Sequence, residues 1–423
     1  MRRTTTHSDA VMAVPRVPLV FGPILTEDDP PLHTTRTSSG LRSHDTADLR
    51  AHLTGVLADY GITRVAHLTG FDRVGLPVHM AVKPQGRSLS SGSGKGVTPD
   101  ASWVSAVMEC CEQSIWENLQ IDTIHTSQDE LLRSGVNIID AGSCPQHKGS
   151  LWAPHVPIQW TRGWDIIAGA EVWVPEALVT VSRIGDKAYR PFISGSNGLA
   201  SGAHVLEAIL SGLMEVIERD GMTLTTHVSQ RPHLDAMDRL RQAEPSVAEK
   251  VERAGLQLEV VDATTDVGVP IIVAYLHDPP GGRTGAFKGA GASLSASSAL
   301  VRAVTEAAQG RCLIVAGARD DIFESQRAAA TNSPLATAVG TEGVLANATE
   351  LSTGTVEGDL ELTCSMLVAA GFHQVAVIRH TAPHESVQVV RVVVPGLEGY
   401  MFSYSAVGQR GRSWQDTYSL EAV

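Results

Sequence analysis

The segment of residues 196–220 has the sequence SNGLASGAHVLEAILSGLMEVIERD. Apolar residues recur at helical spacing over about residues 204–226, which predicts a helix. Three glutamates, Glu207, Glu215 and Glu218, interrupt this apolar body. Acidic side chains are rarely buried without a partner. The segment therefore predicts either the water-facing rim of an amphipathic helix or a site where carboxylates bind a cation.

The composition of the 423-residue chain is typical of a soluble globular protein, with 43% hydrophobic and 19% charged residues. Its net charge of −13 argues against nucleic acid as the main partner, because that affinity comes largely from Lys and Arg. We expect no membrane partner, since no apolar run reaches the roughly 18–20 residues of a membrane span. The first residues do not form a secretory signal peptide, and the five cysteines form no CxxC pair. These features favour a cytoplasmic protein.

Helical and strand patterns alternate along the chain, which predicts an α/β (α+β) architecture. Residues 1–45 are rich in Thr, Ser, Pro and Arg, and we expect a mobile or loosely docked N-terminal arm. No linker interrupts the remainder, so we expect a single domain over residues 46–423. Further helices are predicted at about residues 99–119, 234–254 and 297–315. The sequence shows no repeat of fixed short period.

Two of these helices carry polar residues three or four positions apart, which places them on one helix face. They are Ser105, Glu109 and Glu112 in the first helix, and Arg302, Glu306 and Gln309 in the second. If these helices converge with the helix at 204–226, their oxygen atoms form the hard ligand set that Mg²⁺ prefers. The alternative is that each acidic pair lies on the water-facing rim of its own helix.

Two glycine-rich segments precede these helices and are interpreted as loops. The first, SGSGKG at residues 91–96, does not match GxxxxGK[ST], because Gly96 follows Lys95. A glycine-rich turn that leads into a helix can still present backbone N–H groups to a phosphate, and Lys95 can add a positive charge. The second, GAFKGAGASLSASS at residues 285–298, precedes its helix in the same way.

In this order along the chain, the three motifs resemble the signature of the YcaO family. Members carry an SNG-LA-G segment followed by E-x-x-E-R, an earlier GKG segment followed by S-A-x-x-E-x-x-E, and a later A-L-x-R-A-x-x-E-A-x-Q-x-R. The resemblance covers roughly residues 62–400. It implies a YcaO-type interwoven domain, with mixed sheets flanked by helices and a nucleotide site between helices.

The resemblance implies ATP-dependent activation of a peptide backbone amide, with ATP and Mg²⁺ as cofactors. The amide oxygen attacks the γ-phosphate, a nucleophile adds to the former carbonyl carbon, and phosphate leaves. The resemblance places Glu109, Glu112, Glu215, Glu218 and Glu306 around Mg²⁺ and the phosphates, as catalytic and metal-binding residues. It places Lys95, Ser105, Glu207, Arg219, Arg302 and Gln309 at the nucleotide.

Ala203 departs from the family pattern, because many relatives have Asn at this position. A contact made by that Asn must come from another residue, such as His204, or be absent. All five glutamates expected at Mg²⁺ are nevertheless present.

Two features narrow the reaction within the family. The chain ends in SWQDTYSLEAV, whereas azoline-forming relatives typically end in a PxPxP tail. Residues 62–96 resemble the subgroup encoded beside TfuA proteins, which is associated with backbone thioamides. We therefore expect a thioamide, ranked ahead of an amidine (macrolactamidine) and an azoline.

The expected partners are a precursor peptide and a TfuA-like protein or a separate peptide-recognition protein. A second copy of the chain, in a homodimer, is a further candidate. Two other classes of function stay open. One is a glutamate-rich metal hydrolase that does not use ATP, and the other is a catalytically silent scaffold that binds a peptide.

Overall fold

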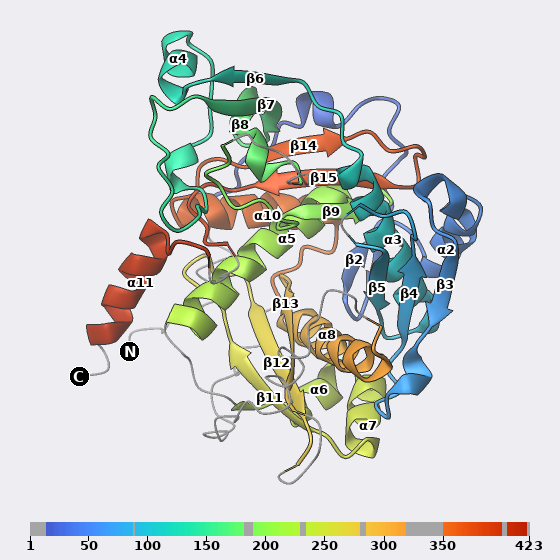
Figure 1. The fold of residues 1–423 in the computed structure, drawn as a ribbon. Coiled ribbons are helices and arrows are strands. Elements are labelled where there is room, and N and C mark those ends of the chain that lie inside the picture. The colour runs from blue at the N-terminus through green and yellow to red at the C-terminus, as the bar shows by residue number, and fades with distance from the viewer. Residues whose placement is uncertain are drawn as a thin grey trace. The chain divides into compact units, whose positions relative to one another are not determined.

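The computed structural model describes residues 14–87, 89–181, 189–228, 234–279, 285–318, 350–399 and 404–420 (Figure 1). These residues fall into two units, each assembled from separate stretches of chain. The described residues of His33–Gln113 and Arg231–Thr355 form the first unit. Those of Val14–Leu32, Ser114–Gln230 and Val356–Val423 form the second unit. The single domain over residues 46–423 stays a prediction.

The first unit contains three antiparallel sheets, shown in Figure 1. The first sheet is the hairpin of β1 (Thr35–Thr37) and β2 (Gly40–Arg42). The second contains β3 (Arg64–His67), β4 (Val78–Val82) and β5 (Ser91–Lys95). The third contains β10 (Leu234–Asp235), β11 (Gln257–Asp262), β12 (Ile271–His277) and β13 (Phe287–Ala292). Its helices are α2 (Thr46–Thr54), α6 (Met237–Ala243), α7 (Pro245–Arg253), α8 (Ala296–Ala316) and most of α3 (Pro99–Glu117). Helix α8 packs on β12 and β13. Apolar side chains of α6, α7, α8, β11 and β12 form a hydrophobic core of this unit.

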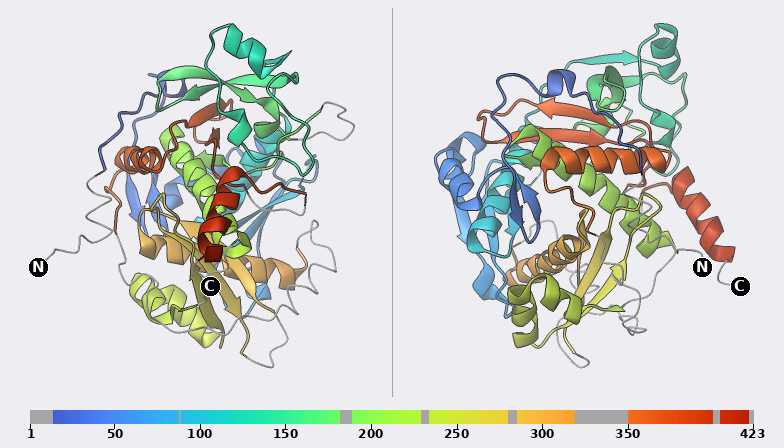
Figure 2. Two further views of the ribbon diagram at one scale, coloured as in Figure 1. Left: turned by 90° about the vertical axis from the view of Figure 1, so that its left-hand side faces the viewer. Right: turned by 180° about the vertical axis from the view of Figure 1, so that it is seen from behind.

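The second unit is built on a six-stranded antiparallel sheet. Its order is β6 (Thr123–Thr126), β7 (Ile158–Asp165), β14 (Ala376–His380), β15 (Gln388–Val393) and β9 (Leu199–Gly202), with β8 (Ala170–Pro175) also paired to β7. Helix α5 (Val205–Met222) packs on β9 and β15 and beside α10 (Val356–Ala369), as the two views of Figure 2 show. The remaining helices are α4 (Gln128–Arg133) and the C-terminal α11 (Gln409–Leu420).

The N-terminal segment makes defined contacts in both units. In the second unit, the Val20 N–H donates to the Ile166 carbonyl at 2.9 Å, and Arg379 donates to the Asp29 carboxylate at 2.6 and 2.8 Å. In the first unit, residues 35–42 form the β1–β2 hairpin. The described part of the expected arm, residues 14–45, is therefore tied down by hydrogen bonds and an ion pair.

The predicted class of fold is confirmed, and α3, α5 and α8 lie where three of the helices were expected. In one respect the sheets differ from the prediction of mixed sheets, because all pairings between the described strands are antiparallel. The prediction of a single helix at 234–254 is wrong, because α6 ends before Pro245 and a second helix, α7, begins at that residue. Proline lacks the N–H that a continuing helix needs and disfavours helical geometry in the preceding residue.

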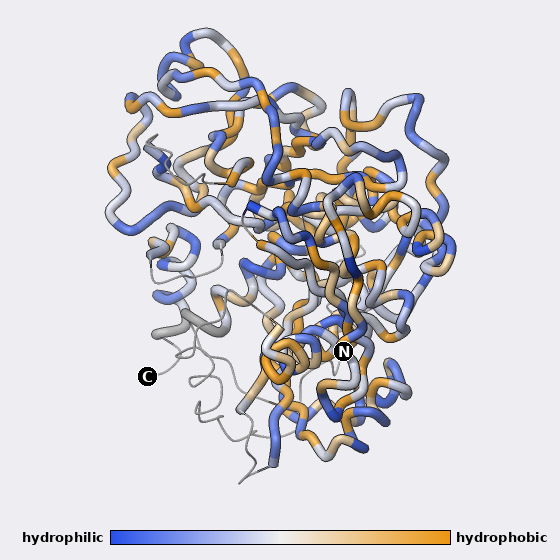
Figure 3. The backbone as a smooth tube through the Cα atoms, turned by 45° about the vertical axis from the view of Figure 1, so that its right-hand side comes forward, coloured by the Kyte–Doolittle hydropathy of each residue, from blue (hydrophilic) through white to orange (hydrophobic). Residues whose placement is uncertain are grey.

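The two glycine-rich segments are strands over much of their length, so their interpretation as loops is wrong. Residues 91–95 form β5 and residues 287–292 form β13. Each strand is followed by a short turn and then by a long helix, and β9 and α5 repeat this arrangement in the second unit. Hydrophobic and hydrophilic stretches alternate along the described backbone (Figure 3).

These three strand–helix pairs, β5–α3, β9–α5 and β13–α8, also share a sequence register. A glutamate lies ten residues after the first residue of each helix (99 to 109, 205 to 215, 296 to 306). Three residues further on stand Glu112, Glu218 and Gln309. The three pairs are therefore copies of one local structure that places a carboxylate at the same helical position.

Glycines bring each helix unusually close to its strand. A Cβ atom on Gly94 in β5 would lie 2.1 Å from the Ala106 backbone nitrogen, and one on Gly291 in β13 would lie 2.9 Å from the Ala303 nitrogen. In the β9–α5 pair, a Cβ atom on Gly202 at the end of the strand would lie 2.7 Å from the Ala208 nitrogen, and one on Gly212 of the helix would lie 3.0 Å from the Gly198 carbonyl oxygen. Only a residue without a side chain fits such an approach.

Candidate functional site

In the first unit, α3 presents Ser105, Glu109 and Glu112 as the spacing predicts, and all three are partly exposed. One oxygen of Glu109 accepts a hydrogen bond from the Ser93 backbone N–H at 3.1 Å, and the other accepts one from the Gln113 side chain at 3.3 Å. The close packing of β5 on α3 makes the first bond possible. Two hydrogen bonds thus fix the direction of the Glu109 carboxylate.

Helix α8 presents Arg302, Glu306 and Gln309 in the same unit. Glu306 forms an ion pair with Lys95, which lies at the end of β5. The structure therefore brings together two predicted site residues that are 211 positions apart. Gln309 is buried, whereas Arg302 is partly exposed.

In the second unit, Arg219 lies between two predicted site carboxylates of its own helix. Its guanidinium is 3.3 Å from Glu218 and 3.7 Å from Glu215. The Glu218 side chain is only 8% exposed, while that of Glu215 is 25% exposed. Arg219 supplies the positive charge that allows an acidic residue to remain in so apolar a helix.

Glu207 and His204 act at the beginning of α5. The buried Glu207 carboxylate accepts a hydrogen bond from the Ala203 N–H at 3.3 Å. The His204 ring accepts one from the Leu206 N–H at 3.1 Å and caps the helix, and burial lowers the pKa of this ring. Ala203 is buried. The side chains of Glu207 and His204 hold the turn before α5, because each accepts a hydrogen bond from a backbone N–H of the same segment.

Two buried arginine–aspartate pairs were not anticipated from the sequence. Arg311, the last residue of the third motif, donates to both oxygens of Asp72 at 3.0 and 3.1 Å inside the first unit. Asp220, which follows Arg219, pairs with Arg410 in the second unit, and burial raises the pKa of Asp220 to about 6 against the effect of Arg410. Nothing local in the sequence signals either pair, because the partners are 239 and 190 positions apart.

The predicted metal-binding residues are divided between the units, with Glu109, Glu112 and Glu306 in the first and Glu215 and Glu218 in the second. Among the described residues, no three His, Cys, Asp or Glu side chains come together as a preformed metal site. The donor chemistry nevertheless fits Mg²⁺, which prefers carboxylate oxygens. In each unit a carboxylate also lies beside a Lys or Arg that can meet a phosphate.

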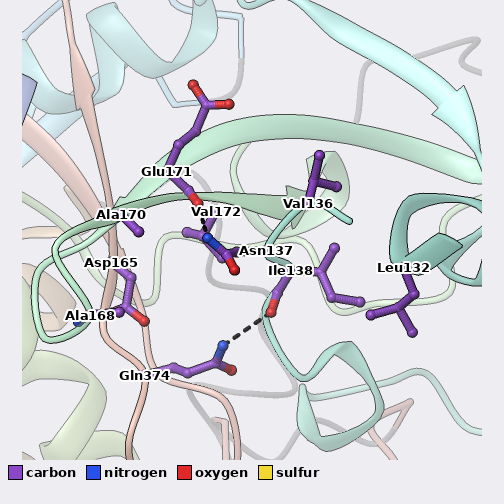
Figure 4. A pocket seen from close by; sticks show the side chains of 10 residues that line it. All are labelled: Leu132, Val136, Asn137, Ile138, Asp165, Ala168, Ala170, Glu171, Val172 and Gln374. Atoms are coloured by element: carbon purple, nitrogen blue, oxygen red, sulfur yellow. Dashed lines mark hydrogen bonds between the residues drawn. The ribbon is translucent and has the colours of Figure 1, made fainter. Parts of the chain in front are cut away.

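A separate hollow of 480 Å³ lies in the second unit and contains none of the predicted site residues (Figure 4). Aliphatic side chains such as Val136 and Val172 line it. Its Gln374 side chain is used internally, since it donates to the Ile138 carbonyl at 3.0 Å and accepts from the Asp140 N–H at 2.9 Å. The carboxylates Asp165 and Glu171 also line this hollow, which is therefore mixed in character and separate from the predicted site.

Within the described ranges, no helix combines the length and the apolar character that crossing a membrane requires.

The sequence matches a known protein family over residues 93–398. That family is described as YcaO cyclodehydratase, ATP- and Mg²⁺-binding. An uncharacterized protein in the tfuA 3′ region of Rhizobium leguminosarum bv. trifolii is 33% identical over 83% of this chain and 86% of its own length. An uncharacterized protein of Methanothermobacter thermautotrophicus is 31% identical over 84% of this chain and 95% of its own length.

Two solved structures share the fold. A YcaO protein from Methanopyrus kandleri, bound with AMPPCP and Mg²⁺, has a TM-score of 0.66 at 24% identity and covers 86% of this chain and 93% of its own. A heterocyclase in complex with substrate and cofactor has a TM-score of 0.72 at 20% identity. The match to the heterocyclase covers 92% of this chain, which spans 57% of the heterocyclase.

The protein belongs to the YcaO family of ATP-dependent, amide-activating enzymes. ATP and Mg²⁺, expected from the motifs, are the ligands of this family.

Proposed function

We propose that this protein installs a thioamide in the backbone of a ribosomally made peptide, in a reaction that consumes ATP and requires Mg²⁺. The observation that carries the choice of product is the relative encoded in a tfuA 3′ region, which matches most of the chain at 33% identity. The resemblance of residues 62–96 to the TfuA-associated subgroup supports the same choice.

The proposed reaction has two steps. The amide oxygen attacks the γ-phosphate, which forms an O-phosphorylated amide and releases ADP. Sulfide or a sulfide equivalent then adds to the former carbonyl carbon, and phosphate leaves with the original oxygen. The protein needs no nucleophile of its own, because phosphoryl transfer depends mainly on positioning and charge neutralisation.

The chain's own residues supply the positioning and the charge. We assign Glu109, Glu112, Glu215, Glu218 and Glu306 to hold Mg²⁺, which when bound offsets negative charge on the phosphates. The two hydrogen bonds to Glu109 keep its carboxylate oriented before any ligand arrives.

Cations beside these carboxylates are suited to bind phosphate oxygens. We assign this role to Lys95, Arg219 and Arg302. Lys95 and Arg219 are held by Glu306 and Glu218 in the same units. Ser105, Glu207 and Gln309 are assigned to the nucleotide pocket, where Glu207 acts by fixing the turn before α5.

A precursor peptide and a TfuA-like protein are the proposed partners, and a separate peptide-recognition protein or a second copy of this chain would be found by the same purification. Affinity purification of the protein from its host, followed by identification of bound chains, tests this assignment.

Azoline formation is the second candidate. It is favoured by the family's description as cyclodehydratases and by the fold shared with a heterocyclase. An azoline forms when a Cys, Ser or Thr side chain of the peptide is the nucleophile in place of sulfide, and water is lost overall.

Mass spectrometry of candidate precursor peptides encoded beside the gene distinguishes these products. Each peptide is incubated with the protein, a TfuA-like protein, ATP, Mg²⁺ and sulfide, and the Glu306→Gln variant is the control. A mass gain equal to the exchange of one oxygen for one sulfur supports the thioamide. Loss of one water instead indicates an azoline or an amidine. ATP-independent cleavage would identify a metal hydrolase, and binding without any mass change would identify a scaffold.

A further inference from the structure

A buried ion pair ties the C-terminal helix to the end of α5. Asp220 has no exposed surface and directly follows Glu218 and Arg219. The Arg410 guanidinium donates to both Asp220 oxygens, with Nε at 2.9 and 3.1 Å and a terminal nitrogen at 2.9 Å. This is the forked geometry that an arginine makes with a carboxylate, and it fixes orientation as well as distance.

A second buried carboxylate completes this contact. The Glu398 N–H donates to Asp220 at 2.9 Å, while the Glu398 carboxylate accepts from the N–H groups of Gly408 and Gly411 at 3.2 and 2.7 Å. A Cβ atom on Gly408 or Gly411 would lie 2.5 or 3.0 Å from a Glu398 oxygen. The two glycines therefore make room for Glu398 on either side of Arg410. We call Asp220, Glu398 and Arg410 the C-terminal latch.

The latch acts on the part of α5 that carries predicted site residues. The Thr223 hydroxyl is 2.6 Å from the Gly399 carbonyl and 2.7 Å from the Arg219 carbonyl, so it joins the last turn of α5 to the segment that follows Glu398. Arg410 also lies over the Phe372 ring, at 5.0 Å from its centroid. The guanidinium is thus held from two sides and cannot swing away without breaking several contacts.

The buried charge of Asp220 explains why the loss of Arg410 would disturb α5. The fully buried Asp220 carboxylate has Arg410 as its forked partner, so removal of Arg410 leaves Asp220 without that positive charge in an environment that excludes water. The last turn of α5 must then rearrange to reach water or another cation. Glu218 and Arg219 lie in that turn, two positions and one position before Asp220 respectively.

We propose that Arg410 is a positioning residue, which holds Glu218 and Arg219 in place through Asp220. Only the expected effect of Arg410 on catalysis rests on the proposed function. The effect on α5 itself is independent of which reaction the protein performs.

The test compares Arg410→Met with Arg412→Met in the full chain. Arg412 lies on the same helix but is exposed, so the two changes remove the same chemical group from a buried and an exposed position. Hydrogen exchange is measured over residues 214–222, and ATP turnover is measured as phosphate release with precursor peptide present. We expect Arg410→Met to speed exchange in α5 and to lower kcat by about 10- to 100-fold, the scale of a small misplacement of catalytic groups. Arg412→Met should change neither.

A chain that also carries Asp220→Asn should regain part of the exchange protection, because no uncompensated charge remains. If Arg410→Met fails to fold, Arg410→Lys keeps the charge without the fork and should give an intermediate acceleration of exchange. Unchanged exchange in α5, or faster exchange with unchanged kcat, would overturn the positioning role. Absence of ATP turnover in the unmodified protein would refute the proposed function alone, and the exchange data would still decide whether the latch holds α5.

Discussion

The β5–α3 pair of the first unit and the β9–α5 pair of the second achieve the same close packing with glycines that are distributed differently. In the first, glycine stands on the strand at position 94. In the second, glycines stand on the strand at position 202 and also on the helix at position 212. Both pairs place a glutamate ten residues after the first residue of the helix. The position of the carboxylate is therefore kept, while the arrangement of the glycines that permit the packing differs.

The two units also neutralise their carboxylates differently. Glu306 pairs with Lys95 from another element, whereas Glu218 pairs with Arg219 from its own helix. The side chains of Lys95 and Glu306 are 31% and 28% exposed, so their ion pair contributes at most about 1 kcal/mol to stability. A gain this small does not explain why the charges are there. The proposed function accounts for these charged groups by a role in ligand binding.

The largest expected effect comes from neutralising one carboxylate in each unit. We expect Glu218→Gln and Glu306→Gln each to lower ATP turnover by about a thousandfold, because loss of one charged group at a phosphate site has effects of this order. Circular dichroism should show that both variants remain folded. Full activity of both variants would show that neither Glu218 of α5 nor Glu306 of α8 has the role assigned to it.

Overpacking of the strand–helix contact should come next. Gly94→Val should lower the free energy of unfolding by about 3 kcal/mol, since the new side chain would overlap the backbone of α3. Valine itself favours strands, so the loss would report the close approach. Chemical denaturation measures it, with Ser93→Val as the control on the other face of β5. Equal stability of the two variants would show that the strand and helix can separate at little cost.

Lys95→Met separates a role in ligand binding from a role in stability. We expect the KM for ATP to rise about tenfold, which corresponds to about 1.4 kcal/mol of lost phosphate interaction. The free energy of unfolding should change by less than about 1 kcal/mol, because the ion pair with Glu306 is partly exposed. A large loss of stability with an unchanged KM would assign Lys95 to the fold instead.

Each unit also buries a histidine, and the two should differ in their response to pH. Burial lowers the pKa of His79 to about 4 and that of His380 to about 3, so both rings stay neutral in the folded protein. The unfolded chain binds these protons below about pH 6.5, so stability falls on acidification. His380→Leu should reduce that slope by about 1.4 kcal/mol per pH unit at about pH 3–6. His79→Leu should do so only at about pH 4–6, so the two variants should differ at about pH 3–4. Denaturation at several pH values checks this, and an unchanged slope for His380→Leu would contradict it.

Local pattern was sufficient for the long helices and for the glutamates on them, because helical spacing alone places Glu109 beside Glu112 and Glu215 beside Glu218. The strand β5 was not predictable in this way. Its Gly and Ser residues have low strand propensity, and pairing with β4 and packing on α3 determine its conformation. The ion pair between Asp220 and Arg410 was not predictable either, because its partners are 190 positions apart and only the tertiary structure brings them together.

The repeated strand–helix pair was also missed from sequence. The first residues of its three helices are 106 and 91 positions apart (99 to 205, 205 to 296), so no fixed period exists. In the β9–α5 copy, Gly212 of the helix adds to the close packing that Gly202 of the strand permits. Only the packing distances reveal that the copies are equivalent.

We propose that glutamates at equivalent helix positions hold Mg²⁺ together with ATP. Calorimetric titration with a non-hydrolysable ATP analogue, with and without Mg²⁺, tests it most directly in the unmodified protein and in Glu109→Gln, Glu215→Gln and Glu306→Gln. We predict Mg²⁺-dependent binding that each substitution weakens by about tenfold or more, the equivalent of about 1.4 kcal/mol. Binding of the analogue that is equally strong without Mg²⁺ and in all three variants would contradict the claim.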